Sequence, residues 1–229
     1  MSIAASTVEP QYNDCLEVLN QHGLAKLGIM SNQVWYDDPR RLVFMLSRYK
    51  FVSKMLSGRN KVAEIGCGDA FGSRIVLQEV KQLQVYDIDP IFVKDINERA
   101  VEKWKLIPGV HDILSGPLAE KQDAIYSLDV IEHIEQAQEH LYIHHIKQSL
   151  APHGVAIIGA PTLESQGHAS PQSKIGHVNC KSGKDFKRFF ENHFHQVFIF
   201  SMNDEVVHTG FYPMAHYMFA ICCEPKLAE

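Results

Sequence analysis

The feature that most constrains the fold is a regular alternation of short apolar runs and helical stretches, which begins after Gly58. Helices are expected over residues 71–79, 90–104, 136–150 and 182–192. Such alternation builds a parallel sheet with helices on both faces. No helix is expected between the last two runs, so the last strand should be antiparallel. We therefore predict an α/β fold with a seven-stranded, mostly parallel sheet, formed by KVAEI, LQVYDI, VHDIL, DAIYSL, VAIIGA, QVFIF and HYMFAICC.

The first 57 residues are interpreted as a helical N-terminal cap. Asp38 can cap a helix, Pro39 suits its first turn, and Gly58 suits the position just past its end. Between them, apolar residues recur at helical spacing. Because 229 residues leave little room for two domains, we assign residues 1–57 to a cap and residues 58–229 to the core of the same domain.

The composition argues against several functional classes. A formal net charge of −5 lacks the basic excess of a general nucleic-acid binder. No apolar run approaches the roughly 18 residues that cross a bilayer, and the first residues do not resemble a signal peptide. The five cysteines include no C-x-x-C pair, which favours reduced thiols. We expect a cytoplasmic protein with neither a nucleic-acid nor a membrane partner.

The segment KVAEIGCGDAFGS, residues 61–73, places three glycines directly after the first apolar run. A loop there lies at the carboxyl edge of a parallel sheet, where ligands bind, and its bare backbone admits a cofactor closely. A dinucleotide site needs G-x-G-x-x-G, but the third glycine, Gly72, arrives one residue late. Glu64 and Asp69 would also repel a pyrophosphate. A ligand with an ammonium group fits better, and an NAD-type oxidoreductase is the alternative.

The segment VAEIGCGDAFG resembles the first motif of the Rossmann-like (class I) S-adenosylmethionine (SAM) dependent methyltransferases of the small-molecule type, and the similarity continues from about Lys61 to Phe200. VYDIDP resembles the second strand of that family, and HDIL the segment that contacts adenine. DAIYSLDVIEHI resembles the fourth strand and the residues after it. The resemblance implies a Rossmann-like sheet, SAM as cofactor, and methyl transfer to an oxygen or nitrogen of a small metabolite.

The resemblance also implies cofactor contacts at each motif. Asp89 is the better match for the residue that binds the ribose hydroxyls, and Asp87 is the alternative. Asp112 would accept a hydrogen bond from the adenine amino group, and Asp129 would lie near the methionine portion. The complete set of implied cofactor residues is Glu64, Gly66, Cys67, Gly68, Asp87, Asp89, Asp112, Ile113, Leu128 and Asp129.

Histidines on the loops at the same edge are candidate catalytic bases, because a neutral imidazole accepts a proton near neutral pH. The segment GHVNCKSGKDFKRFFENHF resembles the family's segment before the last helix, which favours His177 first. His133 follows the fourth strand and comes second, and His168 and His208 complete the set. No recognisable ligand spacing indicates a metal site among His168, His177, His208 and Asp204, so no metal is expected.

The acceptor is less constrained by the sequence. Lys174 and Lys181, in the long loop over residues 161–181, suggest an acceptor that carries carboxylate or phosphate. SLDV stands where a nucleic-acid methyltransferase would carry an N-P-P-Y-type tetrapeptide. We predict a small-molecule methyl acceptor as partner. The oligomeric state stays open, with a homodimer as one option, and a non-catalytic SAM-binding module is the second alternative.

Overall fold

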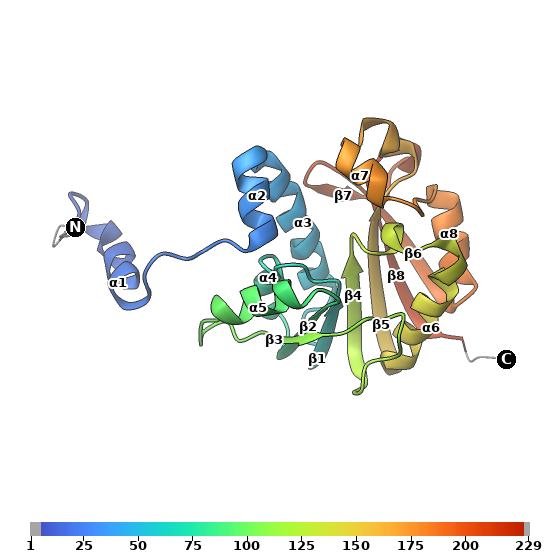
Figure 1. Ribbon diagram of the computed structural model, residues 1–229, viewed down its shortest axis with the longest axis horizontal. Coiled ribbons are helices and arrows are strands. Elements are labelled where there is room, and N and C mark those ends of the chain that lie inside the picture. Colours follow the sequence, from blue (N-terminus) through green and yellow to red (C-terminus); the bar gives the residue numbers. More distant parts are fainter. Residues whose placement is uncertain (1–5, 227–229) are drawn as a thin grey trace.

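Eight strands form one sheet with the order β3-β2-β1-β4-β5-β8-β6-β7 (Figure 1). The computed structural model describes residues 6–226. The first five strands pair in parallel, whereas β8 runs antiparallel to both β5 and β6. The predicted α/β architecture with an antiparallel last strand is confirmed. The strands are β1 (Lys61–Ile65), β2 (Gln82–Asp87), β3 (Ile107–Val110), β4 (Gln122–Leu128), β5 (Leu150–Pro161), β6 (Phe194–Asn203), β7 (Val206–His208) and β8 (Tyr217–Pro225).

Two strands differ from the prediction. The short strand β7 pairs with β6 at the edge of the sheet, inside the connection between the last two predicted runs, so the sheet has eight strands instead of seven. The third strand ends at Val110, where the predicted run VHDIL begins. The sequence IPGV does not predict a strand, because Pro108 has no N–H to donate to a neighbouring strand. The proline is tolerated here because β3 lies at the edge of the sheet.

Helices cover both faces of the sheet (Figure 1). Buried side chains of α3, α4 and α5 pack with one face, and those of α6 and α8 pack with the other. The predicted helix starts are confirmed at Asp38, whose carboxylate accepts from the Arg40 N–H, and at Ser182, whose hydroxyl accepts from the Asp185 N–H. The α-helices are α1 (Asn13–His22), α2 (Ile29–Asp37), α3 (Pro39–Met55), α4 (Ser73–Leu77), α5 (Pro90–Glu98), α6 (Glu139–Ser149), α7 (Pro171–Gly176) and α8 (Gly183–Glu191).

Short 3-10 helices complete the connections. They are η1 (Pro10–Tyr12), η2 (Ile131–His133), η3 (Gln136–Gln138), η4 (Glu164–His168) and η5 (Tyr212–Met214). The long loop over residues 161–181 therefore contains η4 and α7, neither of which the sequence predicted. None of the helices within residues 6–226 has the length and apolarity needed to cross a membrane.

The N-terminal region consists of two parts. Helix α2 lies beside α3, which packs on the sheet, whereas α1 extends away from the rest of the molecule on an extended segment (Figure 1). None of residues 13–22 is buried. The division into a cap over residues 1–57 and a core over residues 58–229 stays a prediction.

Candidate active site

A cavity of about 480 Å³ opens at the carboxyl ends of β1, β2 and β4. This volume lies within the range of small-molecule and cofactor pockets, and the carboxyl edge is where open parallel sheets bind ligands. Of the residues predicted to contact a cofactor, the cavity is lined by Gly66, Gly68, Asp87, Asp112, Ile113 and Asp129.

The three glycines of the loop after β1 have two different functions. Gly66 and Gly68 have φ of +73° and +51°, a region that favours glycine. A Cβ on Gly66 would lie 2.3 Å from Cγ2 of Val130. Gly72 instead has an ordinary φ of −72°, and a Cβ there would lie 2.3 Å from the ring of Tyr49. The late third glycine therefore allows α4 to pack against α3 and does not shape the cavity.

Asp69 connects the glycine loop to α2. Its carboxylate accepts from the backbone N–H of Ser31 at 2.6 Å and from the Ser31 hydroxyl at 3.2 Å, so it caps the first turn of α2. Its carbonyl oxygen accepts from the guanidinium of Arg99, which also forms an ion pair with Asp95 at 2.7 Å. Asp69 is buried and does not line the large cavity. Its charge stabilises α2 and is not directed at a ligand.

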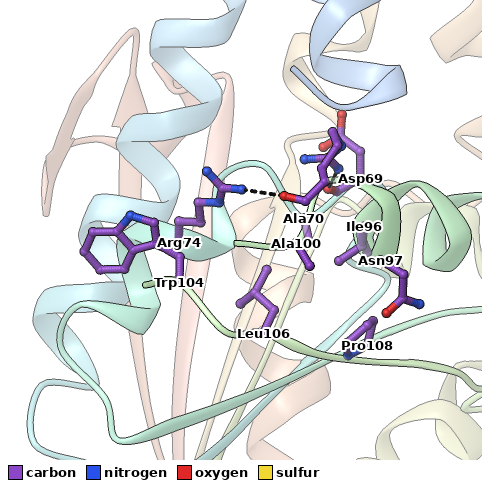
Figure 2. A pocket seen from close by; sticks show the side chains of 10 residues that line it. Asp69, Ala70, Arg74, Ile96, Asn97, Ala100, Trp104, Leu106 and Pro108 are labelled. Carbon is purple, nitrogen blue, oxygen red and sulfur yellow. Dashed lines mark hydrogen bonds between the residues drawn. The ribbon is translucent and has the colours of Figure 1, made fainter. Parts of the chain in front are cut away.

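A second, much smaller cavity lies on the other side of the glycine loop. It measures about 30 Å³ and is lined by Asp69, Ala70 and Arg74 together with residues of α5 and β3 (Figure 2). That volume is about enough for a water molecule. It is far below the size of a nucleoside pocket, so this small cavity cannot hold a cofactor.

The end of β2 separates the two candidate ribose ligands. Asp87 lines the cavity, and its two carboxylate oxygens accept from the backbone N–H groups of Gly68 at 2.8 Å and Asp89 at 2.9 Å. The side chain of Asp89 is exposed and caps α5 by accepting from the N–H of Ile91 at 3.0 Å. The geometry therefore favours Asp87 as the ligand over Asp89, because a carboxylate used as a helix cap is directed along its own helix.

Asp129 occupies a strained position at the end of β4. Its φ is +56°, in the left-handed region that non-glycine residues rarely adopt. Both carboxylate oxygens accept from Nη1 of Arg48, at 2.8 and 2.6 Å. The guanidinium carbon of Arg48 in turn lies 3.8 Å from the ring centroid of Tyr217. The cap helix α3 thus contributes a charged partner to the cavity edge that the sequence did not reveal.

Two of the predicted histidines meet beside the cavity. The rings of His133 and His177 have centroids 5.2 Å apart, and His133 lines the cavity. Nδ1 of His133 lies 2.8 Å from the carbonyl oxygen of Gly176, and Nδ1 of His177 lies 2.8 Å from Oε1 of Gln166. Because both partners are oxygen acceptors, each Nδ1 carries the proton and each Nε2 keeps a free lone pair. Partial burial and the neighbouring His133 lower the pKa of His177.

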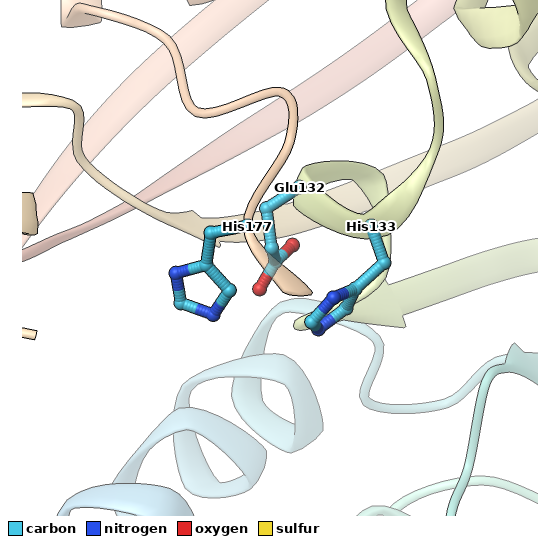
Figure 3. A group of neighbouring side chains, drawn as sticks. All are labelled: Glu132, His133 and His177. Carbon is cyan, nitrogen blue, oxygen red and sulfur yellow. The ribbon is translucent and has the colours of Figure 1, made fainter. Parts of the chain in front are cut away.

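Glu132 lies between these two imidazoles (Figure 3). Its side chain is fully buried, and neither carboxylate oxygen has a hydrogen-bond partner within residues 6–226. Its backbone carbonyl accepts from the N–H groups of Val178 and Asn179, at 2.8 and 3.0 Å. These bonds connect the segment that carries His177 to the 3-10 helix η2, which carries Glu132 and His133.

Comparisons with known proteins agree with this geometry. Residues 63–158 match the family model described as a methyltransferase domain. This stretch of the chain therefore matches a methyltransferase domain, as the sequence predicted. The match supports S-adenosyl-L-methionine as the cofactor over the NAD-type alternative. No curated protein matches the chain in sequence.

Solved structures share the Rossmann-like fold of this methyltransferase domain. The N-methyltransferase NodS from Bradyrhizobium japonicum WM9, in complex with S-adenosyl-L-homocysteine (SAH), is 19% identical, with a TM-score of 0.62 over 95% of this chain and 100% of the NodS chain. Magnesium protoporphyrin IX methyltransferase (ChlM) from Synechocystis PCC 6803, with bound SAH, is 16% identical, with a TM-score of 0.56 over 93% of this chain and 97% of that chain.

Four of the implied cofactor residues lie outside the lining of the cavity: Asp89, described above, and Glu64, Cys67 and Leu128. Glu64 points to the opposite face of β1 from Ile65, because successive residues of a strand alternate, and it accepts hydrogen bonds from the hydroxyls of Tyr49, Ser73 and Tyr126. Burial raises the pKa of Glu64 to about 7. Cys67 and Leu128 are also buried and do not line the cavity.

The other two predicted histidines lie away from the cavity lining. His168 is exposed at the end of η4. His208 lies on the edge strand β7, where Nε2 lies 2.7 Å from Oδ1 of Asn203 and Nδ1 accepts from the N–H of Gly210. Both ring nitrogens of His208 therefore form hydrogen bonds within its own β-hairpin, which gives this residue a structural role.

Several residues that line the cavity, and Glu132 beside it, were missed by the sequence analysis. Glu132 had a recognisable signal, since it is a charged residue inside the apolar segment VIEHI. Met30, from α2, had none, because only folding brings that helix over the glycine loop. The lining residues not predicted are Met30, Ile88, Phe92, His111, Val130 and Ile134, with Ile65 and Leu114 beside them.

Proposed function

We propose that this protein transfers the methyl group of SAM to an oxygen or nitrogen of a small-molecule acceptor bound beside His133 and His177. The observation that carries the proposal is that one cavity joins the glycine loop and the strand ends, which suit the cofactor, to a wall that includes His133. His177 comes from a different loop, and its ring packs against that of His133, with the centroids 5.2 Å apart.

The cofactor contacts follow from the lining of the cavity. The bare backbone at Gly66 and Gly68 admits the methionine portion, and Asp87 binds the ribose hydroxyls. Asp112 and Ile113, on the loop after β3, hold the adenine base. In this proposal SAM would lie across the carboxyl ends of β1, β2 and β3, and Asp129 and His133 would lie near its methionine portion.

Methyl transfer from a sulfonium is an in-line displacement. The C–S bond breaks and its electron pair stays on sulfur, which yields SAH, while the acceptor atom forms the new bond to carbon. Alignment and exclusion of water provide most of the rate enhancement. An acceptor hydroxyl must also lose its proton, and the free Nε2 of His177 or His133 can accept it as a general base.

The charge of the acceptor is not set by the lysines of the long loop. Nζ of Lys181 forms an ion pair with Glu139 at 2.6 Å and donates to Asn179 at 2.9 Å, with only a tenth of its side chain exposed. It is therefore neutralised within the protein. Lys174 is exposed and donates to the carbonyl oxygen of Gly167. The proposal does not require an anionic acceptor.

Labelled SAM and fractionated cell metabolites test this function. We expect transfer of label to a small molecule, with kcat reduced about 100-fold in His177→Asn, as is typical for loss of a general base. The dissociation constant of SAH should stay within about twofold of the wild-type value. His177 lies outside the cofactor wall, by which we mean the lining residues at the carboxyl ends of β1, β2 and β3. His168→Asn is the matched control and should retain wild-type kcat.

Two outcomes would contradict the proposal. Tight SAH binding with no labelled product in any small-molecule fraction would favour a non-catalytic SAM-binding module. Equal rates in His177→Asn and wild type would remove His177 from the reaction.

A further inference from the structure

We propose that Glu132, His133 and His177 form a binding site for one divalent transition-metal ion at the acceptor end of the cavity. The site is called the Glu–His–His cluster below. Its existence does not depend on the acceptor, but the role of the ion in methyl transfer rests on the function proposed above.

The geometry of the Glu–His–His cluster suits a single ion. One ligand atom from each of the three side chains lies within 4.8 Å of the other two. Metal–nitrogen and metal–oxygen bonds are about 2.0–2.2 Å long, so ligands of one ion lie about 3–4 Å apart. Binding an ion would therefore draw the three ligand atoms closer together than their present separation of up to 4.8 Å. Figure 3 shows the carboxylate between the two rings.

The imidazoles are oriented as metal ligands usually are. A ligating histidine donates its other ring N–H to a carbonyl or carboxylate, which fixes the tautomer and the direction of the ring. Here Gly176 and Gln166 supply these acceptors, each at 2.8 Å from Nδ1. Both Nε2 atoms therefore keep the lone pair that a cation needs.

The carboxylate of Glu132 provides the independent argument. A buried carboxylate is normally paired or hydrogen-bonded, because an unpaired one is costly. Within the described chain neither oxygen of Glu132 has a partner, although the residue is fully buried. The nearby cation Arg48 is already bonded to Asp129. A metal ion held by both imidazoles would satisfy this carboxylate.

The ligand set indicates the class of ion and what it would do. Two imidazoles and a carboxylate bind Zn²⁺, Fe²⁺, Mn²⁺ or Co²⁺, and they leave coordination positions open. Because His133 lines the cavity, an open position faces the acceptor. An acceptor oxygen bound there releases its proton to solvent water more readily, and the resulting alkoxide or phenolate attacks the methyl group. With the ion bound, both Nε2 atoms are ligands, so the metal replaces the imidazole base.

Titration of the whole protein with Co²⁺, after removal of metals by EDTA, tests the cluster directly. We expect one Co²⁺ per chain, seen as visible absorption bands and as a saturable heat of binding. His133→Asn, His177→Asn and Glu132→Gln should each weaken binding at least tenfold. The matched control is His140→Asn, because His140 and His193 form a second imidazole pair, with nitrogens 3.0 Å apart. Its affinity for Co²⁺ at the cluster should not change.

The outcomes separate the metal site from the methyltransferase function. Absence of saturable Co²⁺ binding, or unchanged affinity in the His177→Asn variant, overturns the site. The two histidine variants change exposed or half-buried residues, so they test the proposal even if Glu132→Gln fails to fold. SAH titration of each variant reports the cofactor wall separately. Methyl transfer that is unaffected by EDTA overturns the role of the ion, whereas Co²⁺ binding without any methyl transfer overturns the proposed function alone.

Discussion

The two walls of the cavity are built in different ways. The cofactor wall consists of residues at the ends of consecutive strands, and much of it is backbone, as at Gly66 and Gly68. The proposed acceptor wall consists of side chains: His133 lines the cavity, and His177 packs against it from a separate loop. The shape of a wall made of backbone depends on the φ and ψ angles of its residues. The chemistry of a wall made of side chains depends on which loops pack together. Substitutions that disturb one wall should therefore leave the other largely unchanged.

The largest expected effect concerns the support beneath the cofactor wall. Between pH 4.5 and 7, Glu64 ionises in the unfolded chain but stays protonated in the fold, because burial raises its pKa from 4.5 to about 7. The unfolded state then binds fewer protons, so the free energy of unfolding falls as pH rises, by about 3 kcal/mol in total, and levels off above pH 7. Glu64→Gln should remove this contribution, and so make the slope in urea denaturation shallower than in wild type.

The exposed Glu135→Gln serves as the control for Glu64→Gln and should keep the slope. Since Glu64 is a support and not a lining residue, SAH affinity should be similar in Glu64→Gln and wild type at pH 7.5. A large loss of affinity would show that Glu64 belongs to the cofactor wall after all.

The next effect tests the backbone character of the cofactor wall. Gly66→Ala places a Cβ against Val130 at a φ of +73°, which costs about 1–2 kcal/mol in conformational strain alone. We expect SAH affinity to fall about thirtyfold, or about 2 kcal/mol, as measured by calorimetry. Co²⁺ affinity at the Glu–His–His cluster should change little, because the acceptor wall does not depend on this turn.

Gly167→Ala is the matched control for Gly66→Ala. A Cβ there meets no atom within 4 Å, so SAH affinity should not change. Equal effects of the two substitutions would argue against a wall defined by backbone conformation.

The smallest effect distinguishes the two acidic residues after β2. Asp87→Asn should lower SAH affinity about tenfold, since it removes a charged acceptor of hydroxyl hydrogen bonds. Asp89→Asn should change it less than twofold, because asparagine is also a good helix cap. The reverse order in calorimetric titrations would assign the ribose to Asp89.

The cofactor wall was largely predictable from the sequence. Strand, glycine loop and helix are adjacent in the chain, so patterns of a few residues locate Gly66, Gly68 and Asp112. The interpretation of the charges was less successful. Glu64 and Asp69 were read as facing the ligand, but strand alternation turns the first toward Tyr49 and Tyr126, and α2 uses the second as its cap.

The arrangement of the acceptor wall could not be predicted from the sequence. Among four candidate histidines, the family resemblance ranked His177 and His133 first, but nothing in the local pattern showed that these two meet. Order along the chain was enough to specify the α/β fold and its glycine loop, because those depend on interactions between neighbouring residues. The meeting of Glu132 with His177, 45 positions later, depends on how η2 and the long loop pack, and on backbone bonds from Val178 and Asn179 to Glu132. Such contacts between distant segments exist only in the folded chain.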